Sequence, residues 1–255
     1  NHLKENGELD EKKIESTVAT AIRMLDNVID INYYAVPQAK NSNAKHRPIG
    51  LGLMGFQDAL YLRKTPYGSD EAVEFADNSM EMISYYAIKS SSNLAKERGT
   101  YSSYEGSLWS QGIMPLDSIS ILEDQRGKGY IEVDKSMKMD WSALKKIVKT
   151  QGMRNSNVMA IAPTATIANI TGLTQSIEPT YSNLFVKSNL SGEFTVINMH
   201  LVDALKKIDM WDEVMVYDLK NLNGSLEGIN RVPEEIKKLF ATSFEVEPRW
   251  LIESA

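Results

Sequence analysis

The fold class is decided by residues 152–173, Gly-Met-Arg-Asn-Ser-Asn-Val-Met-Ala-Ile-Ala-Pro-Thr-Ala-Thr-Ile-Ala-Asn-Ile-Thr-Gly-Leu. Residues 158–162 form an uncharged apolar run, which is typical of a strand covered on both faces in a parallel sheet. Pro163 ends this run because proline cannot donate to a strand ladder. Thr164 or Thr166 can cap a following helix, and Gly172 can end it in a left-handed conformation. The stretch therefore predicts strand, tight turn and short helix, a unit of an α/β fold.

This arrangement is suited to binding an anion. A helix that begins directly after a parallel strand has unpaired backbone N–H groups and the positive end of its dipole at the carboxyl edge of the sheet. The hydroxyl groups of Thr164 and Thr166 belong to the same turn. Phosphate is the usual ligand at such a position. An ordinary capped helix after a strand accounts for the pattern equally well.

The chain carries several longer motifs in a fixed order. From 154 onward they are Arg154-Asn155-Ser156, Ala162-Pro163-Thr164-Ala165-Thr166, Ser176-Ile177-Glu178-Pro179 and Leu190-Ser191-Gly192-Glu193-Phe194. Two more flank them, His46-Arg47-Pro48-Ile49-Gly50-Leu51-Gly52 with Met54-Gly55, and Glu247-Pro248-Arg249-Trp250. Together the motifs resemble the catalytic large subunit of class I ribonucleoside-diphosphate reductases over nearly the whole chain.

The resemblance implies a substrate site in the turn after the central strand. In that family this loop holds the diphosphate of the nucleotide, and the matching positions are Thr164, Ala165, Thr166, Ile167 and Ala168. Many relatives have Ser-Thr where this chain has Thr166-Ile167, so one hydroxyl is missing. Backbone N–H groups are then the main ligands, and Ile167 contributes only its main chain. The resemblance assigns no catalytic residue and no metal ligand to this segment.

The resemblance also implies a fold. The family has a ten-stranded α/β barrel made of two five-stranded parallel halves, and residues 47–54 and 157–162 would be strands of the second half. Periodicity by itself predicts only βα units. Residues 1–255 would then be a partial barrel domain, incomplete at both ends.

The chain has no cysteine. The family reduces ribonucleoside diphosphates to 2′-deoxyribonucleoside diphosphates with a thiyl radical and a redox pair of cysteines, so those groups must lie in other segments. We expect a fragment that is inactive alone and that binds no cofactor itself. The implied partners are the remainder of the large subunit, a small subunit with a metal-generated radical, nucleoside triphosphate effectors and thioredoxin or glutaredoxin. The full-length subunit would form a homodimer.

Composition excludes other classes of function. The net charge is −6 and basic residues are not clustered, which argues against nucleic-acid binding. No apolar stretch approaches the roughly 20 residues that cross a bilayer, and we expect a cytoplasmic protein. Gly50 and Gly52 lack the third glycine and the acid of a dinucleotide fold, so they indicate close packing. With no second histidine at metal-ligand spacing, His46 is expected to be a structural hydrogen-bonding residue.

Helical periodicity or capping residues predict helices over 10–31, 56–62, 70–98, 140–152, 198–207, 211–222 and 233–240, and another from 248. Residues 183–188 and 193–197 alternate in polarity and flank a turn at 189–192, which predicts a hairpin. Residues 38–45 and 100–139 are expected to be irregular. Glu178 has no partner carboxylate in its motif, so we expect a structural rather than a catalytic role for it. Arg154 and Lys187 are the basic residues nearest in sequence to the anion site.

Three alternatives remain open. A cobalamin-dependent (class II) ribonucleotide reductase shares the barrel. Another phosphate-binding α/β enzyme would use the same loop but needs its own acid and base, for which only Glu178 is nearby. A non-enzymatic interaction module is the third.

Overall fold

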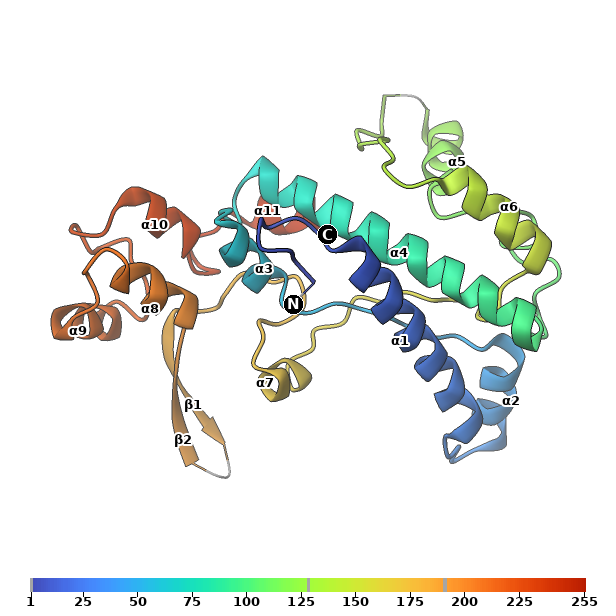
Figure 1. Ribbon diagram of the computed structural model, residues 1–255, viewed down its shortest axis with the longest axis horizontal. Coiled ribbons are helices and arrows are strands. Elements are labelled where there is room, and N and C mark those ends of the chain that lie inside the picture. The colour runs from blue at the N-terminus through green and yellow to red at the C-terminus, as the bar shows by residue number, and fades with distance from the viewer. Residues whose placement is uncertain (1, 128, 190–191) are drawn as a thin grey trace. The chain divides into compact units, whose positions relative to one another are not determined.

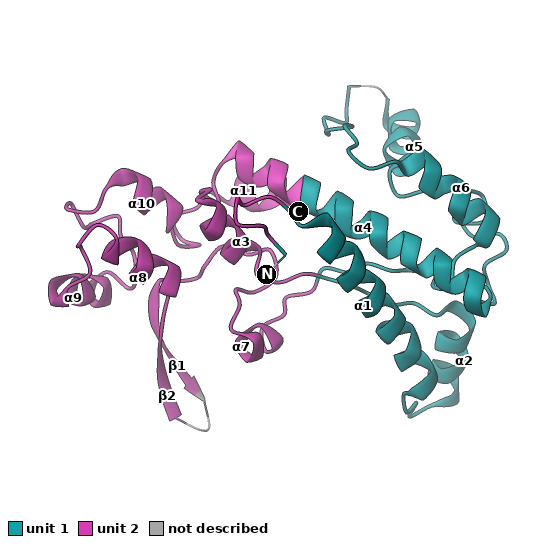
Figure 2. Ribbon diagram, viewed as in Figure 1, with its two compact units in different colours: residues 1–2, 9–52, 78–161 teal, residues 3–8, 53–77, 162–255 magenta. Residues whose placement is uncertain are grey.

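The computed structural model describes residues 2–127, 129–189 and 192–255, which form helices α1 to α11 and a hairpin, β1 and β2 (Figure 1). The helices are α1 Glu11–Ile31, α2 Pro37–His46, α3 Phe56–Arg63, α4 Asp70–Arg98, α5 Asp117–Arg126, α6 Trp141–Gln151, α7 Ile167–Thr171, α8 Met199–Lys206, α9 Glu213–Asn221, α10 Glu234–Leu239 and α11 Pro248–Glu253. The chain divides into two compact units, coloured separately in Figure 2. Unit 1 comprises residues 1–2, 9–52 and 78–161, and unit 2 comprises residues 3–8, 53–77 and 162–255.

The core of unit 1 forms around α1, whose apolar stripe was predicted from the sequence. Ile14, Val18 and Ile22 are buried, and Asp10 caps the helix by accepting a hydrogen bond from the Lys13 N–H. The second half of α4 lies beside α1 (Figure 1), and Lys89 of α4 pairs with Glu15 of α1. Helix α6 completes this core with three buried side chains, Trp141, Leu144 and Val148. The helices predicted over 10–31 and 140–152 are therefore confirmed, although the apolar Val28 of α1 is 48% exposed.

Two segments of unit 1 pair in parallel, but only over a short distance. Leu51 and Met159 form an isolated parallel bridge. The Ile49 N–H donates to the Asn157 carbonyl at 3.0 Å, and the Leu51 N–H donates to the Val158 carbonyl at 2.9 Å. Residues 47–54 and 157–162 are thus adjacent and parallel, whereas the expectation that each is a full strand is wrong. Among the described residues these two segments meet in a single bridge, so few ladder hydrogen bonds fix their backbones as strands.

Glycine is required where these segments approach each other. A Cβ at Gly50 would lie 2.7 Å from the Ala160 Cβ, and one at Gly52 would lie 2.5 Å from the Ala160 carbonyl oxygen. Both distances are shorter than side-chain carbons tolerate, so these glycines permit close approach of the neighbouring backbone, as the sequence indicated.

Unit 2 contains the hairpin and a second apolar cluster. Strand β1 (Leu184–Asn189) pairs antiparallel with β2 (Gly192–Ile197), in a register from Leu184 opposite Ile197 to Asn189 opposite Gly192. The hairpin prediction is confirmed, although Leu190 and Ser191 of the predicted turn lie outside the described residues. The cluster draws on α3, α8, α9 and the segment that follows α9; its members include Tyr61, Leu201, Leu205, Met215, Leu219, Leu226 and Phe240.

Two helices were not predicted. Residues 38–45 were expected to be a loop, yet α2 begins at Pro37, and α5 lies within the stretch 100–139 that was expected to be irregular. Neither helix has a buried residue, and neither has a regular apolar stripe in its sequence that would have indicated a helix. Proline at the first helical position starts α2 rather than breaking the chain, because that N–H has no partner within a helix.

The α/β class is therefore confirmed only in part. The described residues form a mainly helical structure with a two-stranded sheet and one parallel bridge, not a closed barrel. Among these residues, no helix combines the length and the apolar character needed to cross a membrane.

Candidate functional site

The predicted phosphate loop is a tight turn that leads into α7 in unit 2. Thr164 has a left-handed backbone conformation, with φ 53°. Its carbonyl oxygen accepts a hydrogen bond from the Ala168 N–H at 2.9 Å, and its hydroxyl oxygen accepts one from the Ser176 N–H at 2.8 Å. Helix α7 ends at Gly172, which is left-handed as predicted.

The backbone N–H groups of the loop divide into two sets. Those of Ala165, Thr166 and Ile167 have no acceptor within the described part of the chain, and these residues are exposed. Ala168 is buried and its N–H is bonded to Thr164. The Thr164 N–H also has no acceptor among the described residues, so of the five predicted positions only Ala168 has a bonded amide, which closes the turn.

The predicted cap of α7 is wrong in its chemistry. Thr166 occupies the N-cap position but makes no side-chain cap bond. Its backbone is helical, with φ −93° and ψ −45°, whereas a capping side chain reaches the next amides from an extended backbone. The Thr164 hydroxyl, the other candidate, is bonded to Ser176 instead.

Ser176 belongs to a segment that is fixed to the first turn of α3. Asp58 Oδ2 accepts hydrogen bonds from Thr174, from its N–H at 2.7 Å and from its hydroxyl at 2.9 Å. The Thr174 carbonyl accepts the Gly55 N–H at 2.9 Å, and the Ser176 carbonyl accepts the Phe56 N–H at 3.4 Å. Amides at the start of α3 thus find partners in residues 174–176, which are remote in sequence.

Asp58 also faces a histidine. His200 Nε2 of α8 lies 3.3 Å from Asp58 Oδ1. Burial alone raises the pKa of Asp58, but the hydrogen bonds from His200 and Thr174 outweigh burial and hold this pKa below its ordinary value. Asp58 is therefore an ionised acceptor at neutral pH. Nothing in the sequence marked this pair beyond an acid in the first turn of a predicted helix.

Comparison with known proteins identifies the family. The family model described as "Ribonucleotide reductase, barrel domain" matches residues 1–255. The chain belongs to this ribonucleotide reductase family. It is 57% identical over 254 residues to the "Ribonucleoside-diphosphate reductase subunit alpha" of Chlamydia muridarum, covering all of this chain and 24% of that protein. It is 38% identical over 251 residues to the "Ribonucleoside-diphosphate reductase large subunit" of Plasmodium falciparum, covering 98% of this chain and 30% of that protein.

The chain thus spans about a quarter to a third of the length of these curated ribonucleotide reductase relatives. Its described residues contain no group of three or more His, Cys, Asp or Glu side chains placed to hold a metal ion.

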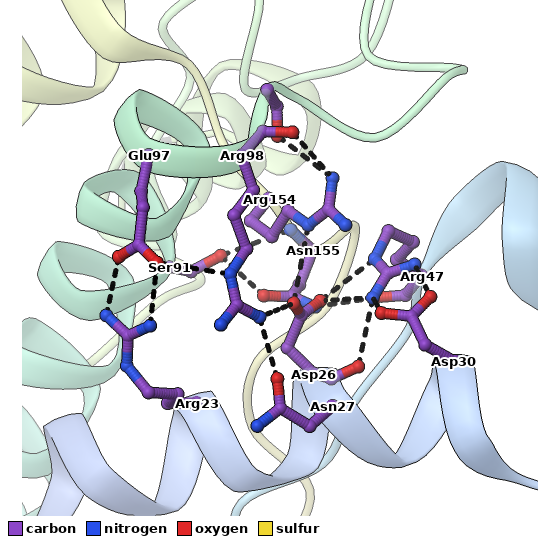
Figure 3. A network of polar contacts seen from close by, with 11 residues as sticks. Arg23, Asp26, Asn27, Asp30, Arg47, Ser91, Glu97, Arg98, Arg154 and Asn155 are labelled. Carbon is purple, nitrogen blue, oxygen red and sulfur yellow. Dashed lines mark hydrogen bonds and ion pairs between the residues drawn. The ribbon is translucent and has the colours of Figure 1, made fainter.

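Arg154, one of the basic residues considered for the anion site of this reductase segment, is bonded elsewhere. In Figure 3 it is part of a polar network in unit 1. Its Nε lies 3.4 Å from Asp26 Oδ2, and its Nη1 donates to the carbonyls of Arg98 and Gly99 at 3.2 Å. Arg154 therefore stabilises unit 1.

Of the other residues singled out from the sequence, Lys187 and Glu178 lie in unit 2, and His46 is the last residue of α2 in unit 1. Lys187 is partly exposed on β1, opposite Phe194. Glu178 is exposed, and no second carboxylate among the described residues is hydrogen-bonded to it. His46 Nδ1 is hydrogen-bonded to the Ser103 hydroxyl at 2.6 Å, which confirms its structural role.

Proposed function

We propose that this chain is the substrate-diphosphate-binding segment of the large subunit of a ribonucleoside-diphosphate reductase, which forms 2′-deoxyribonucleoside diphosphates by thiyl-radical chemistry. The observation that carries the proposal is the turn 164–168, within a chain matched over its whole length by the family model. The names of the similar proteins favour this reaction over the cobalamin-dependent reductase, another phosphate-binding enzyme or an interaction module.

The turn has the groups that a diphosphate needs. The amides of 165, 166 and 167 have no acceptor among the described residues. Each charge-assisted bond from such an amide to a phosphate oxygen contributes about 1.5–3 kcal/mol. The Thr164 hydroxyl accepts from Ser176, so its proton is left to donate to the same anion. Binding the remote diphosphate holds the ribose in place, and such positioning accelerates the reaction.

By analogy with the family, residues 1–255 would form part of the ten-stranded barrel, in which the segments 47–54 and 157–162 lie side by side. The parallel bridge between Leu51 and Met159 supports this arrangement. The partners would be the remainder of the large subunit, a second copy of it, the radical-generating small subunit, nucleoside triphosphate effectors and a thioredoxin or glutaredoxin reductant. The enzyme would be cytoplasmic.

The test places a negative charge in the turn without changing its shape. In the full-length enzyme, Thr164→Asp should raise the KM for the ribonucleoside diphosphate, by about tenfold or more, since like charges this close repel by several kcal/mol in a partly buried site. The matched control is Thr164→Asn, which is similar in size but neutral. Both residues tolerate the left-handed backbone and can accept from Ser176.

The KM of the Thr164→Asn enzyme should stay within about threefold of the original value, because the acceptor is retained. Equal KM values for the Asp and Asn variants would refute diphosphate binding at this turn.

A further inference from the structure

Two residues, one in the loop 164–168 and one in the segment bonded to it, have an unfavourable backbone conformation. Thr164 has φ 53° and Ser176 has φ 41°, both left-handed although neither is glycine. The Ser176 N–H donates directly to the Thr164 hydroxyl at 2.8 Å. Such conformations are strained and persist only where surrounding contacts fix them. The shape of the loop therefore depends on what fixes Ser176.

Ser176 is fixed by its neighbours on both sides. It is 3% exposed. Its carbonyl accepts from Phe56 at 3.4 Å, and the carbonyl of the next residue, Ile177, accepts from the Tyr67 hydroxyl at 2.8 Å. Two residues earlier, Thr174 is bonded to Asp58 through both its N–H and its hydroxyl. The Thr174 hydroxyl oxygen in turn accepts from the Asp58 N–H at 3.3 Å.

Asp58 itself has a fixed position. It lies in the first turn of α3, where a carboxylate is favoured by the helix dipole. Its side chain is only 17% exposed, and the oxygen that does not bind Thr174 faces His200. Asp58 thus presents one oxygen to the segment behind the loop and the other to α8.

We propose that Asp58 is a positioning residue for the diphosphate loop, acting through Thr174 and Ser176 on Thr164. This inference rests on the proposed function. Without the Asp58 acceptor, residues 174–176 lose two bonds to α3, Thr164 loses its fixed donor, and the strained turn relaxes. The amides of 165–167 then no longer hold a single geometry, so the enzyme binds substrate less tightly while its chemistry is unaffected.

The experiment compares Asp58→Ala with Asp58→Asn in the full-length enzyme. Asn keeps an oxygen that can accept from Thr174, whereas Ala keeps none. We expect Asp58→Ala to raise the KM for the diphosphate about tenfold with kcat changed less than about threefold, and Asp58→Asn to recover most of the loss. Amide hydrogen exchange of peptides covering 162–177, without substrate, should be faster in Asp58→Ala than in Asp58→Asn.

A second variant, Thr174→Val, tests the same contact in case Asp58→Ala does not fold. Thr174→Val removes the hydroxyl bonds but keeps the N–H bond to Asp58, so it should change KM and exchange in the same direction by less. Unchanged KM and exchange in Asp58→Ala, an equal loss in Asp58→Asn, or a fall in kcat without a change in KM would each overturn the inference.

These outcomes separate the inference from the proposed function. If Thr164→Asp raises KM and Asp58→Ala does not, the loop binds diphosphate and the positioning role is wrong. If Thr164→Asp and Thr164→Asn bind substrate equally, diphosphate binding at the loop is wrong. The exchange comparison of the two Asp58 variants then still decides whether Asp58 fixes the loop.

Discussion

Asp26 is a buried charge on the apolar face of α1, and it links four segments of unit 1 (Figure 3). Its Oδ1 accepts from Arg47 Nε at 2.9 Å and from Asn155 Nδ2 at 3.1 Å. Its Oδ2 lies 3.2 Å from Arg98 Nη1 and 3.4 Å from Arg154 Nε. Asp26 is 0% exposed, so these guanidinium groups compensate its desolvation. The network ties the segment around 155 to α1 and to the end of α4.

Asp26→Asn should therefore destabilise the protein strongly. The change removes the central negative charge and leaves Arg47, Arg98 and Arg154 close together. Breaking a buried ion pair from one side costs about 3–5 kcal/mol in the free energy of unfolding. Urea denaturation followed by circular dichroism measures this loss in the free energy of unfolding. Arg23→Gln is the control, because it removes an ion pair with Glu97 that is about half exposed. If Asp26→Asn lowered the free energy of unfolding as little as Arg23→Gln does, Asp26 would not be the stabilising centre of this network.

At the scale of elements, several helices begin at an Asp or Asn side chain that caps them. Asp10, Asp140 and Asp212 each accept a backbone N–H at the start of the next helix. Helix α8 is capped by Asn198, whose Oδ1 accepts from the His200 and Leu201 N–H groups at 3.1 and 3.4 Å. This cap also donates from Nδ2 to Asn183 Oδ1 at 2.8 Å, at the start of the hairpin. Asn198 thus joins β2, α8 and the residue before β1.

Asn198→Ala should lower the free energy of unfolding by about 1–2 kcal/mol, the usual cost of losing a helix cap. Asn198→Ser is the matched variant: its hydroxyl oxygen can still cap α8, and it loses the donor to Asn183 without placing a charge beside the Asn183 Oδ1. The free energy of unfolding should fall less in Asn198→Ser than in Asn198→Ala in thermal unfolding experiments. If Asn198→Ser proved as costly as Asn198→Ala, the bond to Asn183 rather than the cap would matter.

At the scale of the whole molecule, most of the buried apolar side chains belong to two clusters, one in each unit, although Phe56, Leu60 and Phe75 lie outside both. Leu144 belongs to the cluster of unit 1 and Leu219 to that of unit 2, and both are 0% exposed. Exposed apolar side chains are also numerous among the described residues, with Tyr181 62% and Phe244 78% exposed in unit 2. Burial, and not apolar character alone, therefore identifies the residues that stabilise each unit.

Leu144→Ala and Leu219→Ala should each lower the free energy of unfolding by about 2–5 kcal/mol, because each leaves a cavity in a packed cluster. Leu108→Ala is the control, since Leu108 is 61% exposed. Its effect should stay within about 0.5 kcal/mol in chemical denaturation. A comparable loss for Leu108→Ala would show that burial does not set these stabilities.

The sequence by itself determined what depends on neighbours along the chain. The stripe of α1, the cap at Asp140, the hairpin and the left-handed end at Gly172 all rest on residues a few positions apart. The local pattern also indicated a turn before a short helix after Pro163, and the resemblance to the reductase family supplied the candidate anion-binding positions 164–168. Helices α2 and α5 were not predicted because neither has an apolar stripe, and Pro37 was not counted as the start of a helix, although Pro233 and Pro248 were.

Only the tertiary structure decided which groups are bonded across long separations. Asp58 and Thr174 are 116 residues apart, and Asp26 and Asn155 are 129 apart. No local spacing connects such pairs, because their contact depends on packing that brings distant segments together. For the same reason, the sequence could name the Thr164 hydroxyl as a candidate cap or phosphate ligand, but the fold decided that it accepts from Ser176.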